Sequence, residues 1–266
     1  DSPGPDIMKA VKGDDNIQIL PVTTATTRVL RMRVDLKPWD DNRVRMALKL
    51  CQHREKILAL AYQGEGEQGQ DFHVYPKHPE YCEKPIPPYN PTKARQLLKD
   101  AGYPDGIDVN IAVGSEWTDV VRYAEVLKQD AVPAGIRVNI QTMTTSQYWE
   151  KWTEVDLGIT PWTHRPLGTM VPNLAYIADD EGKPVPWNET RWVDKEFSEL
   201  LAKASGTLDV DERRKIFCTL EDIQMNRGSI GIAYWMNTWM CPNKKLKNVI
   251  AHPNLLLLFN KVWIDA

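Results

Sequence analysis

The segment from residue 108 to residue 140 constrains the fold more than any other part of the sequence. Asp108–Val113 alternates apolar and polar residues as a strand does, and Gly135–Ile140 reads as a second strand. Between them, apolar residues recur at helical spacing from about residue 119 to 132. A strand, a helix and a strand in this order predict a βαβ unit with parallel pairing. We therefore expect an α/β protein with a mixed sheet and flanking helices.

Further elements are expected on both sides of this unit. Apolar spacing, N-cap residues and a helix-ending glycine predict helices at 43–50, 54–62, 92–101, 147–153, 194–204 and 209–227. Strands are predicted at 17–22, 29–34, 157–160, 230–235 and 255–263. The first two strands have no core-forming sequence before them, so we expect their partner elements upstream of this sequence.

Charge and hydropathy exclude two broad classes. The chain has 33 basic and 36 acidic residues, and a formal net charge of -3 does not suit a protein that coats nucleic acid. The mean hydropathy is -0.45. No apolar run approaches the ~20 residues that cross a bilayer. The ten tryptophans are many for this length and suit either core packing or a binding cleft.

Signatures of catalysis and of metal binding are missing from the sequence. It has no Gly-x-Ser-x-Gly elbow and no His-Glu-x-x-His pair. His73, His78 and Cys82 could together bind a metal, but histidines in loops are more often solvated. We therefore predict no enzyme activity, no metal and no cofactor.

The four cysteines leave two alternatives open. Cys51, Cys82, Cys218 and Cys241 form no Cys-x-x-Cys pair, which excludes the usual zinc and thioredoxin patterns. An exported protein could form a Cys218–Cys241 bridge, or the cysteines could be free buried thiols.

Several segments together resemble one family. In chain order they are 38–48 (PWDDNRVRMAL), 89–98 (YNPTKARQLL), 101–106 (AGYPDG), 127–138, 209–216 and 261–263. This set resembles family 5 of the extracellular solute-binding proteins of ABC importers, the peptide/nickel type of periplasmic binding protein. The resemblance implies a class II periplasmic-binding-protein fold, with two lobes joined by a hinge and a ligand cleft between them.

The resemblance covers the C-terminal half of such a protein. It implies that residues 1–38 hold strands of a largely missing first lobe, that 39–235 form the second α/β lobe, and that 236–266 return to the first lobe. We accordingly expect this sequence to be a fragment whose N-terminal half is a partner.

The resemblance also indicates where a ligand would bind. Peptide-type relatives place a tryptophan after the strand that here ends at Trp162, followed two to three residues later by an aspartate that meets the ligand's amino group. Trp162 matches, but His164 and Arg165 stand where the acid would be. Arg165 could hold a carboxylate or phosphate, or pair with a structural acid. His164 could contact ligand or be a satisfied loop histidine.

Other candidates follow the strand that begins at Ile230. Tyr234, Trp235 and Asn237 could line the cleft, since α/β folds bind ligands at strand ends. Trp235 could equally be a core residue. Asn188 lies in a polar loop near the expected cleft, where it could contact ligand or organise the loop.

The predicted function is solute capture for an ABC importer. The protein would bind a peptide-like or small polar solute between its lobes, outside the cytoplasm, and present it to a membrane permease. The alternative is a noncatalytic sensor or interaction module that kept the fold and lost transport. No nucleic-acid partner is expected.

Overall fold

A six-stranded sheet of mixed direction organises the fold of the computed structural model, which describes residues 4–254 and 256–265. The strands are β1 Leu20–Met32, β2 Gly66–Gln68, β3 Ile107–Gly114, β4 Ile136–Met143, β5 Leu157–Trp162 and β6 Ile230–Met240. Their order across the sheet is β2-β6-β1-β5-β3-β4. A separate ladder joins β7 Leu246–Lys247 to β8 Trp263–Ile264.

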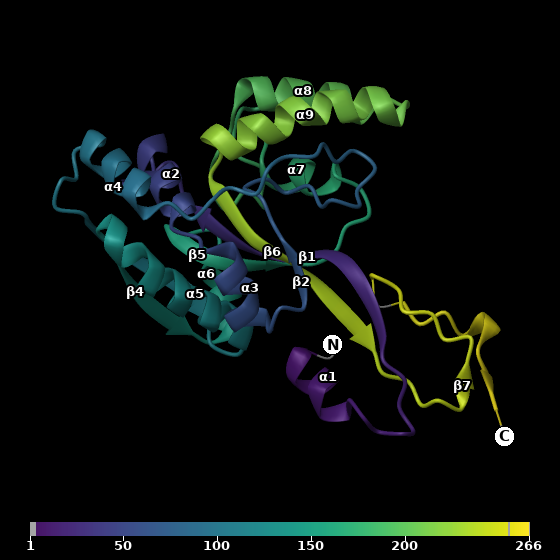
Figure 1. Cartoon of the computed structure of the whole chain (residues 1–266). Coiled ribbons are helices and arrows are strands. Elements are labelled where there is room, and N and C mark those ends of the chain that lie inside the picture. Colours follow the sequence, from purple (N-terminus) through teal and green to yellow (C-terminus); the bar gives the residue numbers. More distant parts are fainter. Residues whose placement is uncertain (1–3, 255, 266) are drawn as a thin grey trace.

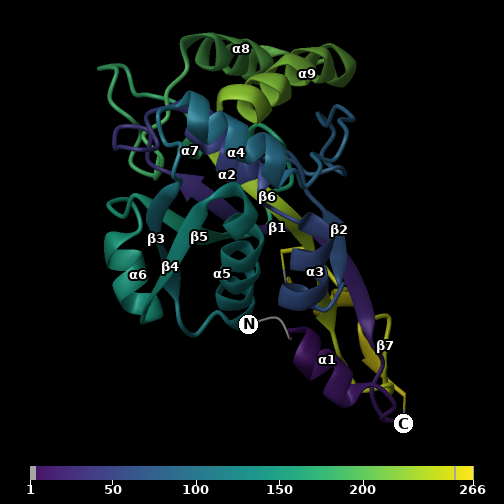
Figure 2. The same ribbon diagram turned by 60° about the vertical axis from the view of Figure 1, so that its left-hand side comes forward.

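Helices cover both faces of this sheet (Figure 1, Figure 2). They are α1 Pro5–Val11, α2 Asn42–Leu50, α3 Arg54–Tyr62, α4 Pro91–Asp100, α5 Thr118–Ala131, α6 Thr145–Lys151, α7 Met170–Ala175, α8 Lys195–Gly206 and α9 Val210–Arg227, with short 3-10 helices at Val132–Ala134 and Phe259–Lys261. None of the helices in the described ranges combines the length and the apolar character of a membrane span.

The predicted βαβ unit is present. β3, α5 and β4 follow one another, and β3 pairs in parallel with β4 and with β5. β1 pairs antiparallel with β5 on one side and with β6 on the other. The mixed α/β class predicted from the sequence is therefore confirmed.

The sheet separates two apolar cores. One lies beneath α2 to α5 and the other beneath α7 to α9. Successive side chains of β1 point to opposite faces of the sheet and so contribute to both cores. Val29 packs into the α7–α9 core and its neighbour Leu30 into the α2–α5 core. On β1 the position of a residue in this alternation decides which core its side chain enters, whereas on β6 the alternation changes between Ile232, in the α7–α9 core, and Tyr234, in the α2–α5 core.

Local sequence signals set several helix ends. Asp41 caps α2 by accepting a hydrogen bond from the backbone N–H of Arg43, and Asp209 caps α9 by accepting from Glu212. After α4, Gly102 adopts a φ of +94°, which a residue with a side chain rarely does. These are the caps and the helix-ending glycine that the sequence predicts.

The N-terminal strand prediction needs correction. The sequence predicts two strands, 17–22 and 29–34, whereas the structure has the single strand β1. The threonines between them are β-branched and favour extended backbone, so the strand continues through them. Its register against β6 is irregular between Thr23 and Thr27.

The predicted C-terminal strand, 255–263, is also wrong over most of its length. Leu255 lies outside the described residues, and Leu256 and Leu257 are more than half exposed. Among the described residues of this range, only Trp263, in β8 Trp263–Ile264, pairs with another strand. An apolar run becomes a strand only where another strand supplies hydrogen-bond partners.

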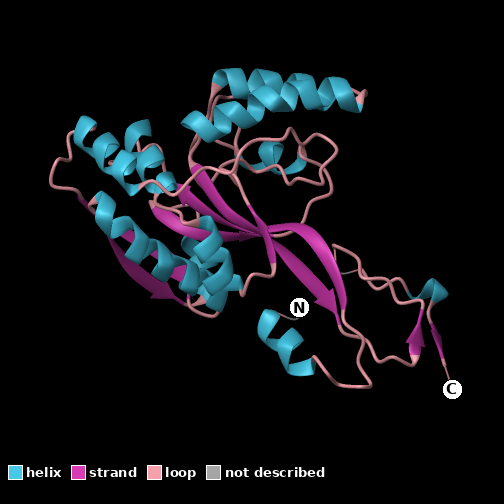
Figure 3. Cartoon of the chain, viewed as in Figure 1, coloured by secondary structure: helices cyan, strands magenta, loops and turns pink. Residues whose placement is uncertain are grey.

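The paired strands β1 and β6 extend beyond the helices as a long ribbon (Figure 3). At its far end the chain connects to α1, which precedes β1, and to β7, which follows β6. Leu20 faces Met240 at that end, and Arg31 faces Ile230 at the other. The lobe limits 1–38, 39–235 and 236–266 stay a prediction.

One disulfide links distant parts of the chain. Cys82, in the loop between β2 and α4, is bonded to Cys218 of α9, 136 residues later. Cys51 and Cys241 are free. The Cys218–Cys241 bridge considered from the sequence is therefore wrong, since Cys218 faces the 69–90 loop.

Candidate ligand-binding site

Tryptophans gather where three parallel strands end. β3, β4 and β5 are parallel, so their carboxyl ends lie at one edge of the sheet. Ring contacts join five tryptophans there, with centroid distances of 5.3 Å (Trp117–Trp149), 5.7 Å (Trp149–Trp152), 6.2 Å (Trp152–Trp187) and 6.0 Å (Trp187–Trp162). We call these five residues the tryptophan row.

Part of the tryptophan row faces solvent. Trp149 is 42% exposed and Trp187 is 46% exposed, which is unusual for so large an apolar side chain. Open α/β sheets bind ligands outside the carboxyl ends of their strands, and aromatic rings offer wide, rigid contact area there. The row therefore marks this edge as the candidate binding surface.

Trp162 is the last residue of the tryptophan row, and a buried side chain holds its indole ring in place. Its indole Nε1 donates a 2.9 Å hydrogen bond to Oε1 of Glu189. The other oxygen of Glu189 accepts a hydrogen bond from Thr160 and lies 3.3 Å from Nε of Arg31, with both charged side chains fully buried. Burial raises the pKa of Glu189, although Arg31 opposes this. A buried, bonded network of this kind fixes the orientation of the indole.

A second aromatic group lies beside Trp162 in the α7–α9 core. His73 contacts the rings of Trp162 at 5.4 Å and Trp235 at 5.8 Å, and Tyr75 contacts Trp235 at 5.3 Å. Burial lowers the pKa of His73 to about 3, so its ring is neutral. Trp235 is fully buried. This burial favours the role of a core residue over that of a residue exposed in the cleft.

Two polar atoms of this group stay unsatisfied. Among the described residues, neither Nε1 of Trp235 nor Nε2 of His73 has a hydrogen-bond partner, although both are buried. Asn237 lies two residues beyond Trp235 on β6, and its Oδ1 is likewise buried with no hydrogen-bond partner among the described residues. Buried polar atoms normally find a partner, so these atoms are free to bond a solute or a water that accompanies it.

His164 and Arg165 follow β5, and they differ in whether their side chains are available to a ligand. Nδ1 of His164 accepts a 2.9 Å hydrogen bond from the backbone N–H of Ala25. Burial, and then the nearby His78, His252 and Arg165, lower its pKa to about 4. His164 thus ties the loop to β1 as a satisfied, neutral histidine.

The guanidinium of Arg165 is half-buried and engages only its own loop. It donates to Oγ1 of Thr163 at 2.8 Å and to the carbonyl of His164 at 3.0 Å. No acidic side chain of the described residues lies within ion-pair distance of it. Its charge is available to an anionic group, and the structural acid considered from the sequence is not found.

Two other predicted residues lie apart from this group. Tyr234 points to the opposite face of β6, where it packs with Tyr62 and its hydroxyl donates to Oδ2 of Asp119. Asn188 is fully buried, and its Nδ2 donates to the carbonyls of Ile177 and Trp192. It organises the loop, which is the second of the roles considered for it.

No sequence pattern pointed to the residues that support Trp162. Arg31 of β1 and Glu189, in the loop between α7 and α8, are 158 residues apart in numbering and meet only in the folded chain. His73 is inside the core with its Nδ1 on the hydroxyl of Tyr176, and Cys82 is in a disulfide, so these two and His78 are not a metal-ligand set. In the described part of the chain, no three His, Cys, Asp or Glu side chains are placed to hold a metal ion.

The fold and this edge define a lobe of the periplasmic-binding-protein type. The family described as bacterial extracellular solute-binding proteins, family 5 Middle, matches residues 1–179. The chain therefore belongs to family 5 of the bacterial extracellular solute-binding proteins.

Individual relatives agree with this family. The glutathione-binding protein GsiB of Salmonella paratyphi A is 25% identical over 226 residues, which cover 78% of this chain and 42% of the relative. Among solved structures, CtaP of Listeria monocytogenes has a TM-score of 0.88 at 14% identity and covers 100% of this chain and 55% of its own. AppA of Bacillus subtilis, in complex with a nonapeptide, has a TM-score of 0.81 at 20% identity, with coverage of 99% and 55%. The chain spans about half the length of these proteins.

Proposed function

We propose that the protein captures a peptide-like or small polar solute for an ABC importer, and that the solute binds where the tryptophan row meets Arg165. The row carries the proposal, because it places exposed aromatic surface at the carboxyl edge. Trp162, fixed by Glu189, supplies the wall nearest the solute. Arg165 and the unpaired atoms near Asn237 and Trp235 supply polar contacts.

In this proposal the edge faces a cleft that a first lobe closes by a hinge motion. Residues 1–38 and 236–266 belong with that lobe, and 39–235 form the second. The paired β1 and β6 cross between them. The closed form is read by a membrane permease outside the cytoplasm, where the solute is collected.

The charge at Arg165 refines the solute class. A guanidinium with no acidic partner binds a carboxylate or phosphate bidentately. No acid stands within ion-pair distance of it among the described residues, so an amino group has no counter-ion at this point. The solute is therefore one that presents a carboxylate, rather than a free amine, toward Arg165.

Isothermal titration calorimetry tests the function. The panel contains glutathione, peptides of two to nine residues, agropinic acid as an opine, and neutral sugars. We expect a carboxylate-bearing member to bind, and its affinity to fall in Trp162→Phe, which keeps an aromatic ring but loses the hydrogen bond to Glu189. Trp263→Phe, at an exposed tryptophan of β8, is the matched control. If no member of the panel binds, or only the neutral sugars do, the proposal is wrong.

A further inference from the structure

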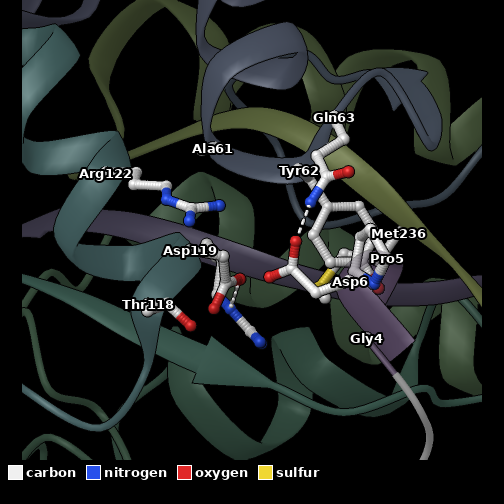
Figure 4. Close-up of a pocket in the computed structure, with 11 residues that line it drawn as sticks. Gly4, Pro5, Asp6, Ala61, Tyr62, Gln63, Thr118, Asp119, Arg122 and Met236 are labelled. Carbon is white, nitrogen blue, oxygen red and sulfur yellow. Dashed lines mark hydrogen bonds and ion pairs between the residues drawn. The ribbon is translucent and has the colours of Figure 1, made fainter. Parts of the chain in front are cut away.

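Arg165 differs from the arginines of β1 in what fixes its direction. Nε of Arg28 lies 2.6 Å from Oδ2 of Asp119, an ion pair drawn as a dashed line at Asp119 in Figure 4. Arg31 is held in the same way by Glu189. Arg165 has no acidic partner among the described residues, and its guanidinium bonds only groups of its own loop. The direction of its side chain therefore depends on how its backbone is held.

Two neighbours restrict this backbone but leave the carbonyl of Arg165 to be fixed. The next residue, Pro166, has no N–H and confines Arg165 to extended conformations. On the other side, Nδ1 of His164 accepts the N–H of Ala25 in β1 at 2.9 Å. A hydrogen bond to the carbonyl of Arg165 would fix the remaining peptide plane, and it has to come from outside this loop.

His78 supplies that hydrogen bond. It lies in the loop between β2 and α4, 87 residues before Arg165, and is 6% exposed. Nε2 of His78 lies 2.7 Å from the carbonyl oxygen of Arg165, and Nδ1 lies 3.0 Å from the backbone nitrogen of Tyr75. A backbone N–H only donates and a carbonyl only accepts, so Nδ1 accepts and Nε2 carries the proton. Burial lowers the pKa of His78, which keeps its ring in this neutral form.

The segment that carries His78 is itself anchored. Oε1 of the fully buried Glu80 lies 3.0 Å from Nε of Arg213 in α9. Oε2 of Glu80 accepts the N–H of Gly168 at 3.0 Å, which ties the same segment to the loop after β5 a second time. Cys82 then bonds the segment covalently to α9. His78 is therefore a fixed point against which the loop after β5 is placed.

We propose that His78 is a positioning residue of the solute site: by donating to the carbonyl of Arg165, it sets the direction in which the guanidinium meets the carboxylate of the solute. This inference rests on the proposed function. His78 does not touch the solute. It acts by restricting Arg165 before the solute arrives, so that less conformational freedom is lost on binding.

Two variants separate the two hydrogen bonds of His78. The amide of a glutamine reaches the position of Nε2 and can donate to Arg165, whereas the amide of an asparagine reaches the position of Nδ1 and can accept from Tyr75. We expect His78→Asn to weaken the carboxylate-bearing solute of the calorimetric panel about tenfold, and His78→Gln to retain most of the affinity. A role confined to the turn at Tyr75 would give the reverse order. His53→Asn, at a histidine that caps α3 through Nδ1, is the matched control.

A double-mutant cycle tests whether His78 acts through Arg165. In the Arg165→Gln background, His78→Asn should weaken the solute by less than about twofold more, because no guanidinium is left to position. Arg95→Gln, at an exposed arginine of α4, is the matched background, in which the tenfold loss should persist. Equal losses in the two backgrounds would show that His78 does not act through Arg165.

The wild-type protein offers a measurement that requires no variant to fold. The ¹⁵N resonances of labelled imidazole rings distinguish a proton on Nε2 from a proton on Nδ1. We expect the proton of His78 on Nε2 both with and without solute. A proton on Nδ1 would exclude the hydrogen bond to Arg165 and refute the inference.

These outcomes keep the inference apart from the proposed function. If the wild type binds a carboxylate-bearing solute and His78→Asn binds it equally well, or better than His78→Gln does, the inference alone is wrong. If the wild type binds no member of the panel, the proposed function is wrong and the inference falls with it.

Discussion

The indole Nε1 of Trp162 and the carboxylate of Glu189 are joined by a 2.9 Å hydrogen bond inside the protein. Glu189 in turn forms an ion pair with Arg31 at 3.3 Å, and neither charged side chain has any exposed surface. Through this chain of contacts a strand in the centre of the sheet determines how a ring at its carboxyl edge is oriented. The polar network therefore contributes to stability and, in the proposed function, orients the ring that contacts the solute.

Breaking this ion pair from one side should be costly. Glu189→Gln leaves the Arg31 guanidinium buried without its counter-ion, and such losses cost about 3–5 kcal/mol. The free energy of unfolding, measured in urea, should fall by about that amount. Glu181→Gln, in a surface pair with Lys183 that is 73% exposed on both sides, should change it by less than about 0.5 kcal/mol.

A thermodynamic cycle compares Arg31→Met and Glu189→Leu with the double variant Arg31→Met/Glu189→Leu. Because the double variant removes both charges, it should cost less than the sum of the two single variants. If the Glu189→Gln protein were as stable as the wild type, the ion pair between Arg31 and Glu189 would not contribute to the free energy of unfolding as predicted.

Arg165 should matter for binding and little for stability. Its side chain bonds only Thr163 and the carbonyl of His164, both in its own loop. Arg165→Gln should therefore weaken the carboxylate-bearing solute of the calorimetric panel by about 1.5–3 kcal/mol. The unfolding free energy should change by less than about 0.5 kcal/mol. Arg95→Gln serves as control, and an unaltered affinity in Arg165→Gln would remove this residue from the site.

Sequence patterns predicted the parts of this fold that local physics controls. The βαβ unit follows from periodicity, and the start of α9 follows from Asp209, whose side chain accepts the N–H of Glu212. The C-terminal strand failed because its existence depends on a partner strand, which the leucines after 255 do not have. Pairing is a property of the fold and not of a segment.

The candidate site was predictable only in part for the same reason. Trp162 ends a recognisable strand, so its place at the edge could be inferred. Tyr234 and Trp235 are adjacent and therefore serve opposite faces, a consequence of the two-residue period of a strand. Glu189 carries no local pattern, and its contact with Arg31 depends on how the loop between α7 and α8 packs against β1.

Glu221 should give the protein a measurable pH dependence. It is 1% exposed, and burial raises its pKa to about 9, against the opposing hydrogen bond from the N–H of Cys82 and the charge of Lys84. Since the folded pKa lies above the unfolded value near 4.5, this group contributes stability that is fully present below 4.5 and is lost as the pH rises toward 9.

Glu221→Gln tests this dependence because the amide keeps an acceptor for Cys82 but does not titrate. The unfolding free energy of the variant minus that of the wild type should rise steadily between about pH 4.5 and pH 9. Denaturation at several pH values in this window measures it, and other titrating groups cancel in the difference. Glu199→Gln, at an exposed position of α8, should show no such trend. Parallel curves for Glu221→Gln and wild type would contradict a buried, neutral Glu221.

The Cys82–Cys218 bond should be the largest single covalent contribution to stability. It closes a loop of 136 residues, for which the chain-entropy account gives about 5 kcal/mol and typical measured values are about 2–5 kcal/mol. Cys82→Ser/Cys218→Ser should lower the unfolding free energy within that range, and a reductant should then have no further effect. Cys241→Ser, at a free cysteine, should change it little. Thiol titration of the denatured, unreduced protein should count the two free cysteines Cys51 and Cys241; four reactive thiols, or a peptide linking Cys218 to Cys241, would contradict the pairing.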